Sequence, residues 1–312
     1  MAITDVTAGT QAGLSFSRWL RAPAARVGGA AAVALLFLPP ALLLFTLFVA
    51  LPMGEAAWYS FYNWNGYGSP TQFVGWRNFE LLFANRAFRT ALTNNLLIIA
   101  VSLAVQLPLA LAMAVLLADR FRGTTTFRLI FFLPYILAEV AAGLIWRFVY
   151  DGEYGLIAKL WDLFGATAPH VLAEPETAMP AVLAVVVWKY FGFHMMLYIA
   201  GLQQIDRNLY EAARIDGATG WQTFSRVTVP LLGPTIRLSV FFSVLGSIQL
   251  FDLIMPLTKG GPSDSTQTMV TYLYNYGVTR MRIGFGSAVG VVLFVICVVF
   301  AFGYNRTTAR DG

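Results

Sequence analysis

The chain has 312 residues, of which 58% are hydrophobic and only 12% are charged. A soluble domain carries about 25% charged residues, so this composition favours a protein solvated by lipid. The single cysteine, Cys297, excludes an intramolecular disulfide, and the two histidines, His170 and His194, fall short of a metal cluster. The formal net charge of +5 is better explained by basic cytoplasmic loops than by a nucleic-acid partner.

Six apolar segments are long enough to cross a membrane. Spanning about 30 Å of hydrocarbon takes roughly 20 helical residues. The predicted spans are, in chain order, 27–54, 90–118, 129–146, 178–203, 238–258 and 283–304. The sequence therefore predicts an all-α polytopic membrane protein with six transmembrane helices and both termini on one side.

The distribution of lysine and arginine predicts which side is cytoplasmic. With the N-terminus inside, the inner segments hold 12 Lys and Arg residues, and these segments are 1–26, 119–128, 204–237 and 305–312. The three outer loops hold 8 such residues on a greater length of chain. Because basic residues accumulate in cytoplasmic loops, we expect both termini in the cytoplasm.

Three ionisable side chains interrupt the predicted spans. Glu139 lies about midway along the third span, Lys189 near the middle of the fourth, and Asp252 nearer the outer end of the fifth. Ionisable groups in lipid cost about 2.5–3.5 kcal/mol each on insertion scales, so they usually face the bundle interior. Gln249 lies one turn from Asp252 and would share its helical face. His194 is more simply explained as a hydrogen-bonded structural residue than as a proton relay.

Two interpretations of the intramembrane charges stay open. In the first, they line a polar path for a hydroxyl-rich solute, with Lys189 and Gln249 as donors. In the second, Glu139 and Lys189 form a buried ion pair that holds two helices together. A lysine in the path would also suit an anionic group such as a sulfonate or phosphate.

The polar stretch between the fourth and fifth spans predicts two short helices. Asp206 can cap a first helix over 207–215. Gly217 suits the left-handed position that ends such a helix. Thr219 and Gln222 have the spacing of a capping box for the second helix. The two helices would lie across the cytoplasmic mouth of the spans, joined by a tight glycine turn that can transmit force.

The same stretch, residues 206–234, resembles the EAA loop of bacterial ABC importer permeases. The residues that carry the resemblance are Glu211, Ala212, Ala213, Asp216, Gly217, Ala218 and Pro230. In that family the loop docks the membrane subunit onto its ATPase partner. The resemblance implies that Glu211 meets basic or polar groups in a cleft of the ATPase, while the two alanines let the helix lie close.

Other stretches resemble the carbohydrate-uptake branch of that family, namely 73–79, 131–134 and 257–262. The resemblance implies the type I ABC importer permease fold, with a permease domain over 27–304 that contains the coupling loop. In the maltose permease of this branch, sugar contacts come from the fourth and fifth core helices. By position, the implied path residues are Tyr190, Phe193, Phe242, Leu245, Gly246 and Gln249, to which Glu139, Lys189 and Asp252 add ionisable groups.

The expected function is that of a permease subunit of an ABC importer in a bacterial inner membrane. The resemblance implies a second homologous permease, two cytoplasmic ATPase subunits and a periplasmic binding protein that delivers a sugar or sugar-like solute. The chain is expected to be no enzyme and to bind no cofactor or metal, because ATP and Mg²⁺ belong to the ATPase.

An ion-coupled secondary carrier is the alternative function. Glu139, Lys189, His194 and Asp252 would then serve as coupling groups. Six helices without a visible internal repeat argue against this alternative, as does the cytoplasmic loop, which would have no task. A membrane-embedded hydrolase lacks any paired catalytic motif in the spans.

Overall fold

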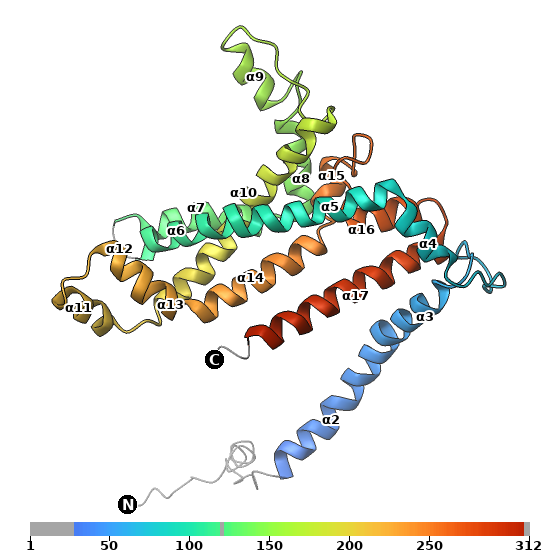
Figure 1. Cartoon of the computed structure of the whole chain (residues 1–312), viewed down its shortest axis with the longest axis horizontal. Coiled ribbons are helices and arrows are strands. Elements are labelled where there is room, and N and C mark those ends of the chain that lie inside the picture. The colour runs from blue at the N-terminus through green and yellow to red at the C-terminus, as the bar shows by residue number, and fades with distance from the viewer. Residues whose placement is uncertain (1–27, 119–121, 309–312) are drawn as a thin grey trace, which may run out of the picture. The chain divides into compact units, whose positions relative to one another are not determined.

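A computed structural model describes residues 28–118 and 122–308, with side chains from Val33 onward (Figure 1). Helices are the regular elements of these residues, and Tyr62 and Phe73 form an isolated β-bridge. The predicted N-terminal segment 1–26 lies outside the described residues, as does the end of the predicted tail. The chain divides into two units, 1–55 and 56–312, which are described separately.

The first unit contains one long apolar helical stretch. It consists of α2 (Gly28–Phe45), the π-helical turn η1 (Thr46–Ala50) and α3 (Leu51–Tyr59), the last of which continues into the second unit. The segment Val33–Tyr59 is long and apolar enough to cross a membrane. This agrees with the first predicted span.

The second unit holds the remaining elements. In chain order these are α4 (Arg77–Ala84), α5 (Arg86–Val101), η2 (Ser102–Gln106), α6 (Leu107–Ala118), α7 (Thr124–Ile136), α8 (Glu139–Val149), α9 (Leu156–Asp162), α10 (Pro175–Leu202), α11 (Arg207–Ile215), α12 (Gly220–Thr223), η3 (Phe224–Thr228), α13 (Val229–Leu231), α14 (Gly233–Ile248), α15 (Ile254–Leu257), α16 (Met269–Tyr272), η4 (Leu273–Val278) and α17 (Ile283–Thr308).

Four helical stretches of the described chain can each cross a membrane by length and composition. They are Val33–Tyr59, Arg86–Ala118, Pro175–Leu202 and Ile283–Thr308. Two bent pairs, α7 with α8 and α12–α13 with α14, raise the number to as many as six. The all-helical, polytopic fold class is therefore confirmed.

The third predicted span, 129–146, is wrong as a single helix. α7 ends at Ile136, α8 begins at Glu139, and the two helices are bent by 97°. Leu137 and Ala138 between them have extended backbone conformations. Glu139 is consequently the first residue of a helix rather than a residue midway along one, and a helix N-terminus favours a negative charge.

The fifth predicted span, 238–258, is also wrong in extent. α14 ends at Ile248, and residues 249–253 are not helical. Side chains take the place of helical hydrogen bonds there, because Asn95 Nδ2 donates to the carbonyl of Ser247 (2.6 Å) and Thr268 Oγ1 donates to that of Leu250 (2.8 Å). Gln249 and Asp252 therefore do not share one helical face.

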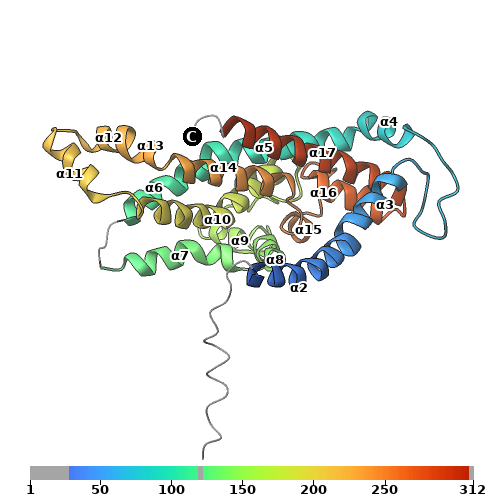
Figure 2. The same ribbon diagram turned by 90° about the horizontal axis from the view of Figure 1, so that it is seen from below.

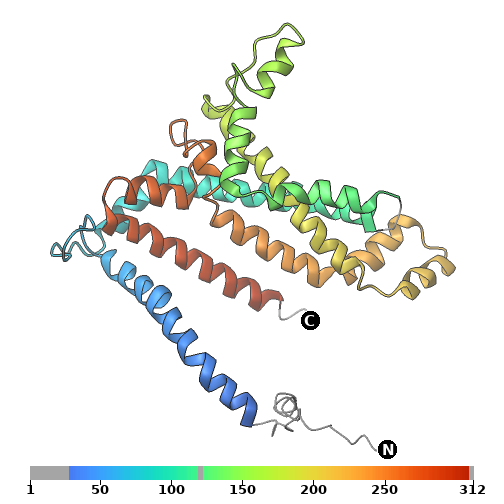
Figure 3. The same ribbon diagram turned by 180° about the vertical axis from the view of Figure 1, so that it is seen from behind.

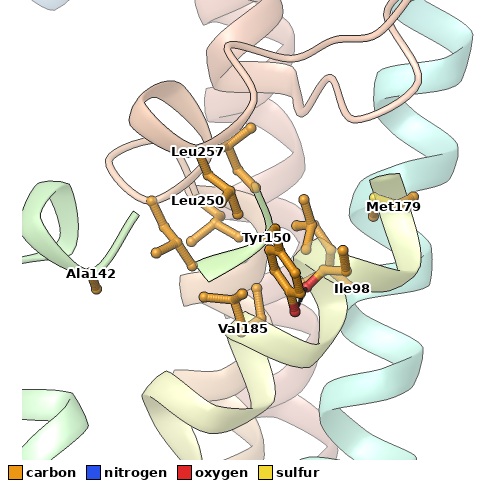
Figure 4. Close-up of a cluster of buried hydrophobic side chains, with 12 residues drawn as sticks. Ile98, Ala142, Tyr150, Met179, Val185, Leu250 and Leu257 are labelled. Carbon is orange, nitrogen blue, oxygen red and sulfur yellow. Dashed lines mark hydrogen bonds between the residues drawn. The ribbon is translucent and has the colours of Figure 1, made fainter. Parts of the chain in front are cut away.

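Helix α10 is central to the packing of the second unit and contacts α6, α7 and α14. A cluster of buried apolar side chains joins α10 to α5, α8 and the segment that follows α14 (Figure 4). Its members include Ile98, Ala142, Val185 and Leu253, all of them 0% exposed. This cluster packs the non-helical segment 249–253 against α5, α8 and α10, so the segment is held in place without a helix of its own.

The ends of the second unit differ in character (Figures 1 and 2). α11 and α12 lie at one end, with the last turn of α6 and the start of α7 nearby, and α4 and α16 lie at the other. α8 turns away from the line of α7, as Figure 3 shows from behind. The two-helix segment is thus separated along the unit from the α8–α9 region.

Candidate functional site: a polar cavity and an exposed two-helix segment

A cavity of about 540 Å³ lies among the helices of the second unit. It is bounded by η2, α10, α14, the segment 249–252 and the break between α7 and α8. Its lining residues are Ile98, Ser102, Gln106, Tyr135, Glu139, Val186, Tyr190, Phe193, His194, Phe242, Ser243, Leu245, Gly246, Ser247, Gln249, Leu250, Phe251 and Asp252. The cavity therefore mixes aromatic surfaces with carboxylate, amide and hydroxyl groups.

The structure brings together eight of the nine residues predicted for the solute path. These are Glu139, Tyr190, Phe193, Phe242, Leu245, Gly246, Gln249 and Asp252. They come from α8, α10, α14 and the segment after α14, so both breaks in the predicted spans contribute to the cavity. Their role toward a solute stays a prediction.

Aromatic rings form one wall of the cavity. The rings of Tyr135 and Phe193 stack with centroids 4.8 Å apart, and Phe193 meets Phe242 edge-on at 6.2 Å. The hydroxyl of Tyr190 donates a hydrogen bond of 2.8 Å to Glu139 Oε1. That bond orients the carboxylate at the start of α8, beside the rings.

Lys189 occupies a different position from the predicted one. Its side chain is 1% exposed and does not line the cavity. Nζ donates to the carbonyl oxygens of Pro134 (2.9 Å), Tyr135 (3.0 Å) and Leu137. An ammonium has three donors, and the end of a helix leaves carbonyls without intrahelical partners. Lys189 thus satisfies the C-terminal end of α7, and its donors are occupied.

The alternative of a Glu139–Lys189 ion pair is also wrong for this structure. No nitrogen–oxygen contact within 4.0 Å joins the two side chains, both of which lie in the described part of the chain. Glu139 instead accepts from Tyr190, and Lys189 is held by backbone oxygens. The two charges sit on the two sides of the same helix break.

Several residues that line the cavity were not predicted from the sequence. Gln106 is 2% exposed and Ser243 is 6% exposed, and neither Gln106 Oε1 nor Ser243 Oγ has a hydrogen-bond partner among the described residues. Ser102 lies four residues before Gln106, and Ser247 four after Ser243. A polar pair at this helical spacing inside an apolar span is the signal that would have found them.

His194 lines the cavity from α10. Its Nδ1 lies 2.7 Å from Ser239 Oγ of α14, and the residue is 3% exposed. This bond joins two helices that border the cavity. The prediction of a hydrogen-bonded histidine is confirmed.

The local structure predicted for the polar stretch 206–234 is confirmed. Asp206 caps α11 by accepting from Asn208 N (3.0 Å), and Gly217 has a left-handed φ of 73°. Thr219 and Gln222 form a reciprocal capping box, with bonds of 2.8 and 3.3 Å. The two helices and the glycine turn follow from these local interactions.

The surface of this two-helix segment is unusually apolar for an exposed turn. Ile215 is 86% exposed and Trp221 is 73% exposed, and they flank the turn at Gly217. Glu211 is exposed on α11, whereas Ala213 is buried. Large exposed apolar side chains are typical of a site of protein contact or of contact with a membrane surface.

No metal centre is formed by the residues that the structure describes, since no three His, Cys, Asp or Glu side chains among them converge. The cavity and the two-helix segment are therefore the candidate sites. An all-helical chain with several membrane-crossing helices, a polar cavity between them and an exposed helical segment at one end has the architecture of a polytopic membrane transport subunit.

The family is defined by comparison with known proteins. Residues 6–310 match the family described as binding-protein-dependent transport system inner membrane component, and the chain belongs to this family. It is a permease subunit of a binding-protein-dependent ABC importer and a multi-pass membrane protein. The resemblance drawn from residues 206–234 is thereby confirmed.

Relatives cover nearly the whole chain. The diacetylchitobiose uptake system permease protein NgcF of Streptomyces coelicolor is 33% identical over 290 residues, which cover 88% of this chain and 82% of that protein. The sulfoquinovosyl glycerol transport system permease protein SmoG of Agrobacterium fabrum is 31% identical over 275 residues, covering 88% and 89%.

A solved structure shares the fold. A chain of a bacterial ABC transporter involved in the import of the acidic polysaccharide alginate matches with a TM-score of 0.79 and 24% identity. The match covers 91% of this chain and 99% of that chain. The ABC importer permease fold is therefore shared over nearly the full length of both chains.

Proposed function

We propose that this chain forms half of the translocation path for a sugar or sugar-like solute in a bacterial inner membrane. A second homologous permease supplies the other half, and a periplasmic binding protein delivers the solute. The proposal is supported by relatives whose names assign them to sugar derivatives. It is also supported by the mixture of aromatic and hydrogen-bonding groups in the cavity, which suits a hydroxyl-rich solute with apolar ring faces.

The proposed topology has six spans and both termini in the cytoplasm. The spans are Val33–Tyr59, α5–α6, the bent α7–α8 pair, α10, α14 and α17, within a permease domain over 27–304. The excess of lysine and arginine in the alternate loops supports this orientation, with 12 inside and 8 outside. Segments 1–26 and 305–312 would then be cytoplasmic.

The exposed two-helix segment α11–α12 is the observation on which the proposed contact with the ATPase depends. We assign contact with the ATPase to Glu211, Ala212, Asp216, Gly217 and Ala218. Ala213, predicted for the same contact, is buried within the subunit. The exposed side chains of Ile215 and Trp221 supply apolar area for that contact, and Glu211 supplies charge. Gly217 fixes the angle between the helices, because a φ of 73° suits glycine far better than other residues.

Motion, rather than chemistry, is the proposed contribution of this chain. Two ATPase subunits bind ATP and Mg²⁺, close on ATP binding and carry α11 and α12 with them. The helices then change from an inward-open to an outward-open arrangement, and the binding protein releases the solute into the cavity. No bond is made or broken by this subunit, which acts as a non-catalytic component.

Cysteine cross-linking in the complete importer tests this assignment. Cys297 is the only cysteine in the sequence, so a Cys297→Ala background is free of thiols from this chain. Ile215→Cys on that background, labelled with benzophenone maleimide, is expected to photo-cross-link to the ATPase subunit, because the benzophenone inserts into C–H bonds and needs no thiol on the partner. Leu163→Cys, 79% exposed next to α9, is the matched control and is expected to give no ATPase adduct. Labelling of Ile215→Cys from the outside of intact cells would contradict the assignment.

A further inference from the structure

The charged groups that line the cavity are of one sign. Glu139 and Asp252 present carboxylates, and no lysine or arginine from the described chain lines the cavity. Lys189 lies close to the break but is 1% exposed, and its donors are held by three carbonyl oxygens. His194 is engaged with Ser239. A solute in this cavity would therefore meet carboxylates and no cationic side chain of this subunit.

Two further acceptors in the cavity have no partner. Gln106 Oε1 and Ser243 Oγ belong to side chains more than nine-tenths buried, and both line the cavity. Buried polar atoms almost always have a hydrogen-bond partner. Gln106 belongs to the π-helical turn η2, and such turns are frequent at functional sites. Gln106 Oε1 can only accept, and Ser243 Oγ can accept or donate, so both atoms can receive a hydrogen bond from a ligand.

We propose that the cavity takes a glycoside that is uncharged or carries a protonated amine, and that it discriminates against carboxylated, sulfonated and phosphorylated sugars. This inference rests on the proposed function and gives that function a class of solute. Sugar hydroxyls and ammonium groups donate to carboxylates, and such charge-assisted bonds are the strong ones. An anionic sugar would place its charge beside the like charges of Glu139, which is partly buried, and Asp252, which is exposed, and like charges repel.

The two carboxylates of the cavity differ in how firmly they are held. Glu139 Oε1 is fixed by the Tyr190 hydroxyl at 2.8 Å, at the first residue of α8. The carboxylate of Asp252 has no hydrogen bond within the described structure and lies on the non-helical segment after α14. One acceptor is thus fixed in place and the other is free to bond a solute.

Binding of three matched sugars to the complete importer in lipid nanodiscs tests the proposal. The probes are glucose, glucosamine at a pH that keeps its amine protonated, and glucuronate, measured by ligand-observed NMR at millimolar concentrations without binding protein. Glucose and glucosamine are expected to bind, and glucuronate is expected to bind at least about tenfold more weakly than glucose.

Variants that neutralise carboxylates test whether the discrimination comes from the cavity or from the net charge of the subunit. Glu139→Gln with Asp252→Asn is expected to reduce the difference between glucose and glucuronate to about threefold or less. The control pair Glu153→Gln and Asp162→Asn removes the same charge from exposed positions around α9 and is expected to leave the difference unchanged. Asp252→Asn alone serves if the double variant does not assemble, and it is expected to shift the difference in the same direction.

The outcomes distinguish this inference from the proposed function. Glucuronate binding as tightly as glucose, or a difference that the cavity variants do not move, overturns the charge selection and leaves the sugar path standing. Failure of all three sugars to bind overturns the assignment of the cavity as a sugar site, and with it the selection.

Discussion

At the break between α7 and α8, one side chain replaces the hydrogen bonds that a continuous helix would have made. Lys189 Nζ reaches three carbonyl oxygens from α10, across a helix–helix contact. The residue is buried, so water does not take its place when it is removed. In the structure it satisfies the carbonyls at the C-terminal end of α7.

Replacing Lys189 by methionine is expected to destabilise the subunit. The substitution keeps the apolar stem but leaves the carbonyls of Pro134, Tyr135 and Leu137 unpaired. A hydrogen bond from a charged donor contributes about 1.5–3 kcal/mol, so the total loss is expected to be about 3 kcal/mol or more. Thermal unfolding in detergent measures it, with the exposed Lys159→Met as control. An unchanged melting temperature combined with altered solute affinity would instead support the predicted role of Lys189 in the solute path.

Charge reversal at Glu211 is expected to uncouple the importer. Glu211→Lys places a cation on the exposed face of α11, where the proposed ATPase cleft offers basic or polar groups. Solute-stimulated ATP hydrolysis in proteoliposomes is expected to fall at least about tenfold, since like-charge contacts at an interface cost several kcal/mol. Glu153→Lys makes the same reversal on an exposed residue beyond α8 and is expected to leave activity unchanged. Full activity of Glu211→Lys would count against the contact.

Among the elements, α7 and α10 approach each other closely at a glycine. A Cβ at Gly192 would collide with the carbonyl oxygen of Phe131, which is backbone and cannot turn aside. The glycine therefore sets the distance between the two helices, about one turn along α10 from Lys189.

Gly192→Ala is expected to lower the free energy of unfolding by about 1–3 kcal/mol, the range of an overpacked core. Gly233→Ala is the matched control, because a Cβ there meets nothing within 4 Å. Thermal unfolding of the two variants in the same detergent compares them. Equal melting temperatures of Gly192→Ala and Gly233→Ala would show that α7 and α10 can move apart with little loss of stability.

The turn between α11 and α12 gives a second test at the scale of elements. Gly217→Pro is incompatible with a φ of 73° and also removes the N–H that donates to the carbonyl of Arg214. Uptake is expected to be lost while membrane insertion is retained, because the change is confined to an exposed segment. Gly220→Ala, in open space, is the control. Normal uptake by Gly217→Pro would contradict the role of the turn.

The elements that the sequence predicted well are those set by neighbours along the chain. The caps at Asp206 and Thr219 and the left-handed Gly217 depend on residues within a few positions, so their spacing indicates them. The carbonyls at the break between α7 and α8 are satisfied by Lys189, about 50 residues later, and spacing along the chain does not indicate this contact. The end of α14 likewise depends on Asn95 and Thr268 from other elements.

For the whole molecule, the composition and the apolar segments were enough to predict a polytopic helical protein. The lining of the cavity was predicted in part. Six of its residues follow from family position, and Glu139 and Asp252 follow from their charge inside apolar segments. Gln106 and Ser243 were missed. Each has a serine four residues away in the sequence, and the fold places both pairs in one cavity. Lys189 was misplaced because its hydrogen-bond partners are backbone atoms, which the sequence does not distinguish.

The energy source is a prediction for the complete assembly. Uptake is expected to stop when cellular ATP is depleted and to continue when the proton gradient is collapsed by an uncoupler with ATP maintained. The reason is the proposed pairing of this permease with separate ATPase subunits, which would supply the energy for uptake. Radiolabelled solute uptake under the two treatments measures this. The opposite pattern would favour an ion-coupled carrier that uses the cavity carboxylates.

Helix α10 has 28 residues, about 42 Å at 1.5 Å per residue, and it runs without interruption from the α9 side to the start of α11. Helix α10 packs closely on α7 at Gly192, and one turn away Lys189 donates hydrogen bonds to α7. These two contacts oppose sliding of α10 along α7. A push received at α11 would reach Tyr190 and Glu139 at nearly its original amplitude, as along a stiff rod. Helix α10 would then couple the displacement of the ATPase subunits to the displacement of the residues that contact the solute.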